Sequence, residues 1–179
     1  MRKIILTLMI LSGTILYSFA QTENSLKISI GPEIGMPVGQ ANKLYNLTEG
    51  FSVKMETPLS STDLNLTITA GYSNFRVYNY YSQFINNGTY VPIEVGLKKY
   101  LDATSIVYFL ANVGASFNIN GNSTGPKTAP IFSPGIGISI PAAGNGIDLS
   151  GRYEGRVEKG GTVSQLALCV AYRFGYKKE

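Results

Sequence analysis

The chain has 179 residues, no histidine and one cysteine, which excludes an intrachain disulfide and a catalytic group built on a histidine base. Charged residues make up 15% of the chain, compared with about 25% in ordinary soluble domains. The formal net charge is +4 but no basic run occurs, so we expect no nucleic-acid partner.

Residues 1–20 have the three parts of a secretion signal. Arg2 and Lys3 give a positive start, an apolar run follows, and Ser18 to Ala20 form a small-x-small cleavage pattern. The apolar run is shorter than the roughly 18 to 20 residues that span a bilayer, which favours cleavage over a retained anchor. We therefore expect an exported protein whose residues 21–179 form a single domain.

Eight segments of the mature chain have the composition of β-strands and are separated by clusters of Gly, Asn, Pro and Ser. Most are longer than the usual five or six residues of globular strands, and about nine to eleven tilted residues cross a bilayer. The expected strands are residues 25–36, 50–59, 64–75, 89–101, 106–119, 130–140, 146–157 and 164–174.

Apolar and polar residues alternate with a period of two in most of these segments. In residues 146–157, apolar side chains point to one face and charges of both signs point to the other, a pattern that a helix would mix around its circumference. Residues 106–119 are less regular, because Tyr108 and Leu110 fall on the nominally polar face. The alternation predicts a sheet with one apolar and one polar face.

The connections also alternate in length. The links after the second, fourth and sixth strands are short, whereas those after the first, third and fifth, at residues 37–49, 76–88 and 120–129, are longer. The last link, residues 158–162, is a tight hairpin. Short turns at one rim and long loops at the other are typical of outer-membrane barrels, which keep the turns in the periplasm.

Three observations favour a membrane barrel over a soluble one. The polar face is rich in Gly, Ser, Thr and Asn, which suits a narrow lumen, and the aromatics of the apolar face gather near strand ends, where lipid meets water. An even number of strands also permits the closure that lipid demands. The alternative is a soluble, lipocalin-like periplasmic carrier, whose characteristic helix and entrance tryptophan have no counterpart here.

The final strand, Gln165 to Phe174, ends in an aromatic residue, and with the strand pattern of residues 25–174 it resembles the small OmpA/OmpX-type outer-membrane β-barrels, also called porin-family proteins. The resemblance implies an all-β, eight-stranded, antiparallel up-and-down transmembrane barrel in the outer membrane of a Gram-negative cell. It also implies outer-membrane lipid and the barrel-assembly machinery as partners, exposure at the cell surface, and a monomer.

Charged residues of both signs lie on the face that we expect to point inward. An unpaired charge is costly in a narrow lumen, so we expect a cross-strand network of ion pairs that holds the barrel closed. The alternative is a gated ion path or a proton relay. The residues of this predicted network are Lys27, Glu33, Lys54, Glu56, Glu94, Lys98, Asp148, Arg152, Glu154, Arg156 and Arg173.

We expect no enzyme activity, no catalytic residue, no metal site and no cofactor. Glu94 and Glu154 are carboxylates of the kind that act as acid and base, but basic partners such as Arg152 lie on the same face. Cys169 lies on the narrow inward face, where a small core residue is expected rather than a nucleophile.

Residues 75–84 combine Tyr, Asn, Ser and Arg, the side chains favoured in recognition surfaces. The alternative is an interface girdle with an extension of the third and fourth strands, since Tyr and Phe also suit a sheet. The sequence thus predicts a structural and surface-interaction role with an unidentified surface ligand. The alternative function is a narrow ion or small-solute channel. The candidate surface-binding residues are Arg76, Tyr78, Tyr80, Tyr81 and Phe84.

Overall fold

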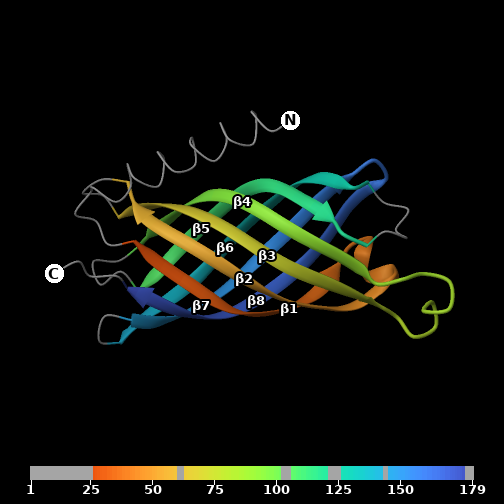
Figure 1. Cartoon of the computed structure of the whole chain (residues 1–179), viewed down its shortest axis with the longest axis horizontal. Coiled ribbons are helices and arrows are strands. Elements are labelled where there is room, and N and C mark those ends of the chain that lie inside the picture. Colours follow the sequence, from red (N-terminus) through yellow and green to blue (C-terminus); the bar gives the residue numbers. More distant parts are fainter. Residues whose placement is uncertain (1–25, 60–62, 102–105, 121–125, 143–144, 176–179) are drawn as a thin grey trace, which may run out of the picture.

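Eight antiparallel strands form a closed barrel in a computed structural model that describes residues 26–59, 63–101, 106–120, 126–142 and 145–175. Each strand pairs with its neighbours in the chain, and β8 closes the barrel by pairing with β1 (Figure 1). No helix among these residues is long and apolar enough to cross a membrane. The elements are β1 (Lys27–Val38), the short 3-10 helix η1 (Ala41–Lys43), β2 (Tyr45–Pro58), β3 (Leu64–Val77), β4 (Gly88–Tyr100), β5 (Val107–Asn118), β6 (Thr128–Ala142), β7 (Asn145–Glu158) and β8 (Gly161–Gly175).

The prediction of an all-β, up-and-down, eight-stranded barrel is confirmed, and nearly all strand ends lie within three residues of the predicted ones. The start of β2 is the exception, because β2 begins at Tyr45 rather than at residue 50. Tyr45 and Leu47 pair with Val77 and Arg76 across an irregularity in the register. The first loop is therefore shorter than predicted, because residues 45–49 belong to β2. These residues include no glycine that would have marked a turn.

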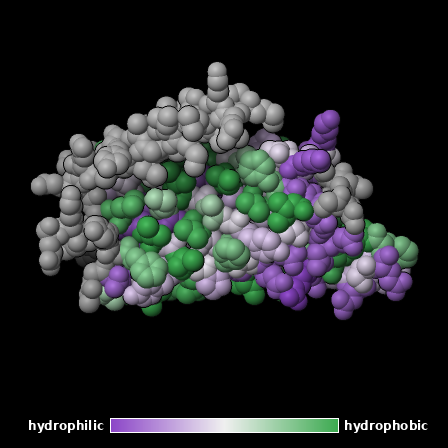
Figure 2. All heavy atoms as spheres, in the orientation of Figure 1, coloured by the Kyte–Doolittle hydropathy of each residue, from purple (hydrophilic) through white to green (hydrophobic). Residues whose placement is uncertain are grey.

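The two faces of the sheet are reversed relative to a soluble protein. In β1, Ile30 and Ile34 are 46% and 55% exposed on the outside, whereas Ser29 and Glu33 are buried inside. The same alternation runs around the barrel, so that apolar side chains cover the outer surface (Figure 2). Figure 2 also shows hydrophilic side chains gathered toward the end of the barrel that carries the longer loops.

The irregular alternation of β5 has a structural cause. Tyr108 and Leu110 both point into the lumen and are buried, and they form a small core cluster with Tyr100. Tyr108 pairs in register with Gly137, and a Cβ on Gly137 would lie 2.3 Å from the Tyr108 ring. The absence of a side chain at this position therefore makes room for an inward-pointing tyrosine.

Substitution of Gly137 by Ala should displace the Tyr108 ring and lower the free energy of unfolding by about 1–3 kcal/mol, the usual cost of overpacking. Urea titration of the folded barrel in detergent would measure it. Gly160→Ala is the matched control, because a Cβ there meets nothing within 4 Å. Equal stability of the two variants would contradict this account of β5.

Candidate functional site

The half of the lumen nearest the short turns is filled by a network to which every strand contributes a side chain. We call this network the lumenal plug. Its members, in strand order from β1 to β8, are Lys27, Glu56, Asn65, Lys98, Tyr108, Ser139, Asp148 and Arg173. Because strands start and end alternately at the turn rim, residues far apart in the sequence meet in one layer.

Lys98 is the centre of the plug. Its ammonium group lies 2.8 Å from a Glu56 oxygen and 3.1 Å from an Asp148 oxygen, and 3.9 Å from the centroid of the Tyr108 ring. The side chain of Lys98 is fully buried. A buried charge is tolerated where close partners surround it, and here two carboxylates and an aromatic face do so.

The two carboxylates of the plug have further partners. Asn65 donates to Glu56 at 2.6 Å, and the Tyr108 hydroxyl donates to Asp148 at 2.5 Å. Lys54 lies 3.7 Å from Asp148, which makes it a looser partner than Lys98. At the rim, Arg173 donates to the Ser139 hydroxyl. Both oxygens of each carboxylate, Glu56 and Asp148, therefore have hydrogen-bond or ion-pair partners within the lumen.

A second group of charges lies deeper in the barrel, between the plug and the loops. Arg152 binds both oxygens of Glu33 at 2.7 Å and contacts Glu154 at 3.2 Å. Ser52 and Gln165 donate to these two carboxylates. Glu94 accepts a hydrogen bond from Ser133, and no basic side chain of the described residues lies within 4.0 Å of it. Two of the three carboxylates in this acidic layer therefore share the Arg152 guanidinium, and Glu94 is held by a hydroxyl.

Aromatic side chains close the lumen at the loop end. Phe75 packs edge-to-face against Tyr45 and against Tyr90, with both ring centroids 5.4 Å away. The Arg156 guanidinium lies 4.1 Å from the centre of the Tyr90 ring, donates to the Pro126 carbonyl at 2.8 Å and pairs with Glu158. We call this group the aromatic cap.

The structure places the eleven predicted inward charges in three separate groups rather than in one continuous network. Ten are buried, and Lys27 is half-buried at the turn rim. Sequence reasoning missed the tyrosines and amides that complete the pairs, above all Tyr108 and Gln165. The irregular pattern of β5 was the one signal that pointed to Tyr108. Cys169 is buried, with its sulfur 3.9 Å from the Ser52 hydroxyl.

The five candidate surface-binding residues do not lie together. Arg76 lies on the outer surface of β3, where it binds Glu49 at 2.7 Å, and so it belongs to the barrel wall. Tyr78 is tied to the first loop, because its hydroxyl donates to Asn42 and its N–H donates to the Leu44 carbonyl. β3 continues to Val77, so Arg76 lies within the strand and Tyr78 directly follows it.

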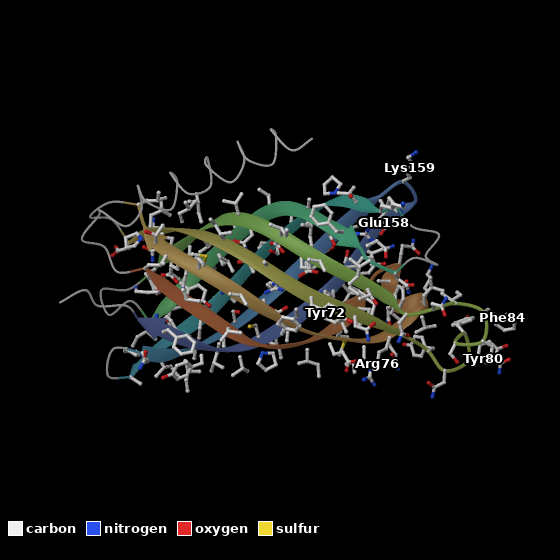
Figure 3. All side chains as sticks on the ribbon, in the orientation of Figure 1. Tyr72, Arg76, Tyr80, Phe84, Glu158 and Lys159 are labelled. Atoms are coloured by element: carbon white, nitrogen blue, oxygen red, sulfur yellow. The ribbon has the colours of Figure 1, made fainter. Side chains whose placement is uncertain are left out.

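Tyr80, Tyr81 and Phe84 lie beyond the barrel, in the loop between β3 and β4. Tyr80 and Phe84 are each 81% exposed, and they project furthest from the barrel rim (Figure 3). The rings of Tyr80 and Tyr81 meet edge-to-face at 5.2 Å. We call residues 79–85 the loop tip.

Hydrogen bonds lie both within the loop tip and at its base. Within it, the N–H groups of Phe84 and Ile85 both donate to the Tyr81 carbonyl at 2.9 Å. At its base, the Asn87 side chain accepts from the Val77 N–H at 3.0 Å, and the Asn87 carbonyl accepts from the side chain of Asn120, in the β5–β6 loop. The tip is thus braced against its neighbours and presents its aromatic rings outward.

No group of three or more His, Cys, Asp or Glu side chains in the described part of the chain could hold a metal ion.

The fold is shared with solved outer-membrane proteins. The attachment invasion locus protein Ail of Yersinia pestis matches with a TM-score of 0.59 and 19% identity, over 86% of this chain and 100% of that one. Neisserial surface protein A matches with a TM-score of 0.59 and 13% identity, over 84% and 97% of the two chains. The N-terminal barrel domain of Pseudomonas aeruginosa OprF matches with a TM-score of 0.53 and 12% identity, over 84% and 99%.

At these identities the likeness shows a common fold. Neither the protein-family models nor the curated proteins include a match to this chain. Ail has also been solved in a phospholipid bilayer nanodisc and in complex with the heparin analogue sucrose octasulfate.

Substitution of Lys98 by Met should lower the free energy of unfolding by about 3–5 kcal/mol, since two buried carboxylates would lose their closest cation. Arg76→Ala is the matched control: it removes an exposed pair and should cost less than about 1 kcal/mol. Urea titration, read from the folded fraction on an unboiled gel, compares them. Similar losses would contradict a central role for Lys98.

Proposed function

We propose that this protein is an integral outer-membrane β-barrel that keeps its lumen closed and uses its loops as a binding surface. One observation carries the proposal: the exposed outer face of the closed sheet is apolar, and its charged side chains are buried inside. Lipid is the solvent that such a surface fits, because each exposed apolar side chain is stabilised there. The likeness to outer-membrane proteins supports the same environment.

The arrangement of the lumen favours a scaffold over a transport role. Conduction would have to pass the lumenal plug, the acidic layer and the aromatic cap, and the plug is held by ion pairs as short as 2.8 Å. A soluble carrier would need an apolar interior for its ligand, whereas this interior is lined by buried charges. The predicted signal sequence at residues 1–20 lies outside the described residues. Export, cleavage, a monomeric state and use of the barrel-assembly machinery belong to the proposal.

The loop end is suited to anionic ligands. Its loops and adjoining strand ends, at residues 37–49, 76–88, 120–129 and 156–162, carry five basic and two acidic side chains, a net charge of +3. Ail binds a sulfated sugar analogue in one of its structures. An anionic surface ligand is therefore the class that we propose for this chain.

A boiled and an unboiled sample from outer-membrane fractions should migrate differently, because a closed barrel resists unfolding in detergent. On intact cells a membrane-impermeant maleimide should label Phe84→Cys, in the loop tip, but not Asp63→Cys, in a short turn. The native Cys169 is buried and should stay unlabelled in both. Labelling of Asp63→Cys alone would reverse the orientation, and a soluble, unshifted protein would contradict the membrane assignment.

The closed lumen can be tested against the narrow-channel alternative in planar bilayers. Wild-type protein should show no sustained conductance, and Lys98→Ala should raise the frequency of opening because it removes the centre of the plug. Arg76→Ala, on the outer wall, should behave as wild type. Regular conductance steps in the wild-type protein would favour the channel.

A further inference from the structure

The barrel has a second exposed apolar surface besides its lipid-facing wall. This surface is the loop tip, where Tyr80 and Phe84 are each 81% exposed and Ile85 is 37% exposed. A belt of hydrophilic side chains separates the tip from the apolar wall (Figure 2). The membrane that holds the barrel therefore does not cover the tip.

The loop tip belongs to a long uncharged stretch. The chain carries no charged residue from Val77 to Ile93. Asn and Ser side chains accompany the aromatic rings, and the tip projects outward rather than forming a groove (Figure 3). Such a tip can enter an apolar phase without desolvating a charge, and rings with polar edges favour the boundary between lipid and water.

The positive charge of the loop end comes from three other loops. Of its five basic side chains, Arg76 is paired with Glu49 and Arg156 with Glu158. The remaining three are exposed, and within the described residues they make no ion pair. They are Lys43 in the first loop, Lys127 before β6 and Lys159 in the β7–β8 hairpin.

We infer that the loop end docks onto an anionic phospholipid bilayer, with the loop tip inserted at its interface and the three lysines facing its headgroups. This rests on the proposed function, which places the loops outside the cell. A soluble polyanion would satisfy the lysines but leave the aromatic tip exposed, and an uncharged protein pocket would cover the tip but leave the lysines without partners. An anionic bilayer satisfies both, since interfacial binding adds apolar insertion to electrostatic attraction.

Flotation tests the inference with the full mature barrel held in phosphatidylcholine nanodiscs. Wild-type protein should float with vesicles that contain phosphatidylglycerol and not with vesicles of phosphatidylcholine alone. Tyr80→Ser/Phe84→Ser should reduce binding by about tenfold or more. Lys43→Gln/Lys127→Gln/Lys159→Gln should reduce it by roughly fivefold for each lysine removed, and added salt should mimic this loss. Asn79→Ser/Gln83→Ser, which changes polar tip residues, should bind as wild type.

The absence of tryptophan from the chain allows a direct measurement of insertion. Phe84→Trp supplies a unique fluorophore, whose emission should shift to shorter wavelength when phosphatidylglycerol vesicles are added. The same reporter in the triple-lysine variant should shift only at higher vesicle concentration. Sucrose octasulfate should compete weakly, because it engages the lysines alone.

Several results would overturn the inference and leave the proposed function intact. Among them are wild-type barrels that shift on boiling and label at the tip but do not float with either vesicle, binding that survives loss of both tip rings, and tight binding of sucrose octasulfate with no emission shift on vesicles. A protein that fails the boiling and labelling tests would instead remove the proposed function itself.

Discussion

The whole structure depends on closure of the sheet. In lipid, water cannot satisfy an unpaired backbone N–H or C=O group, so a sheet that spans a membrane has to pair its last strand with its first. The pairing of β8 with β1 does this, from Lys27 with Gly175 to Val38 with Ser164. Closure with eight strands leaves a narrow interior, and every inward side chain must then pack against inward side chains from across the barrel.

The narrow lumen explains why its charges are grouped. A charged side chain near a short turn can reach partners from any strand, because all eight strands begin or end at that rim, and the plug gathers Lys98, Glu56 and Asp148 there. Deeper in the lumen, Arg152 is surrounded by carboxylates from β1 and β7. Removing one partner of a buried ion pair leaves the other charge uncompensated, which costs more free energy than the intact pair contributes to stability. A substitution at any member of a group is therefore expected to destabilise the whole group.

The sequence alone predicts the fold because the alternation of apolar and polar residues repeats in strand after strand. A shift of one residue in the pairing register of a strand would turn its charged side chains to the apolar outer face. It predicts the inward set of charges for the same reason. It does not predict their partners, since register across the barrel decides which side chains meet. Tyr108 illustrates this: its inward position depends on Gly137, which lies on another strand and is distant in sequence.

The sequence predicts the positions of the loop residues less well than those of the lumenal residues, for a physical reason. Arg76 and Tyr80 are close in sequence, yet Arg76 continues the period of β3 and points outward beside Glu49, whereas Tyr80 lies past the last ladder pair. The alternation of inward and outward side chains predicts orientation only within a strand, and it makes no prediction for residues beyond the end of the sheet. Only tertiary contacts, such as the hydrogen bond from Tyr78 to Asn42, fix where the loop stands.

This division between wall and loops bears on where function resides. In the proposed membrane location, lipid constrains the outward wall positions and buried partners constrain the inward ones, so a change at either tends to destabilise the barrel. Tyr80 and Phe84 are under neither constraint, because both are largely exposed and make no contact that the sheet requires. A contiguous exposed apolar patch commonly marks a site of interaction with a protein or a membrane. A braced loop that carries these two rings beyond the polar belt is therefore better explained by a bound partner than by the stability of the barrel.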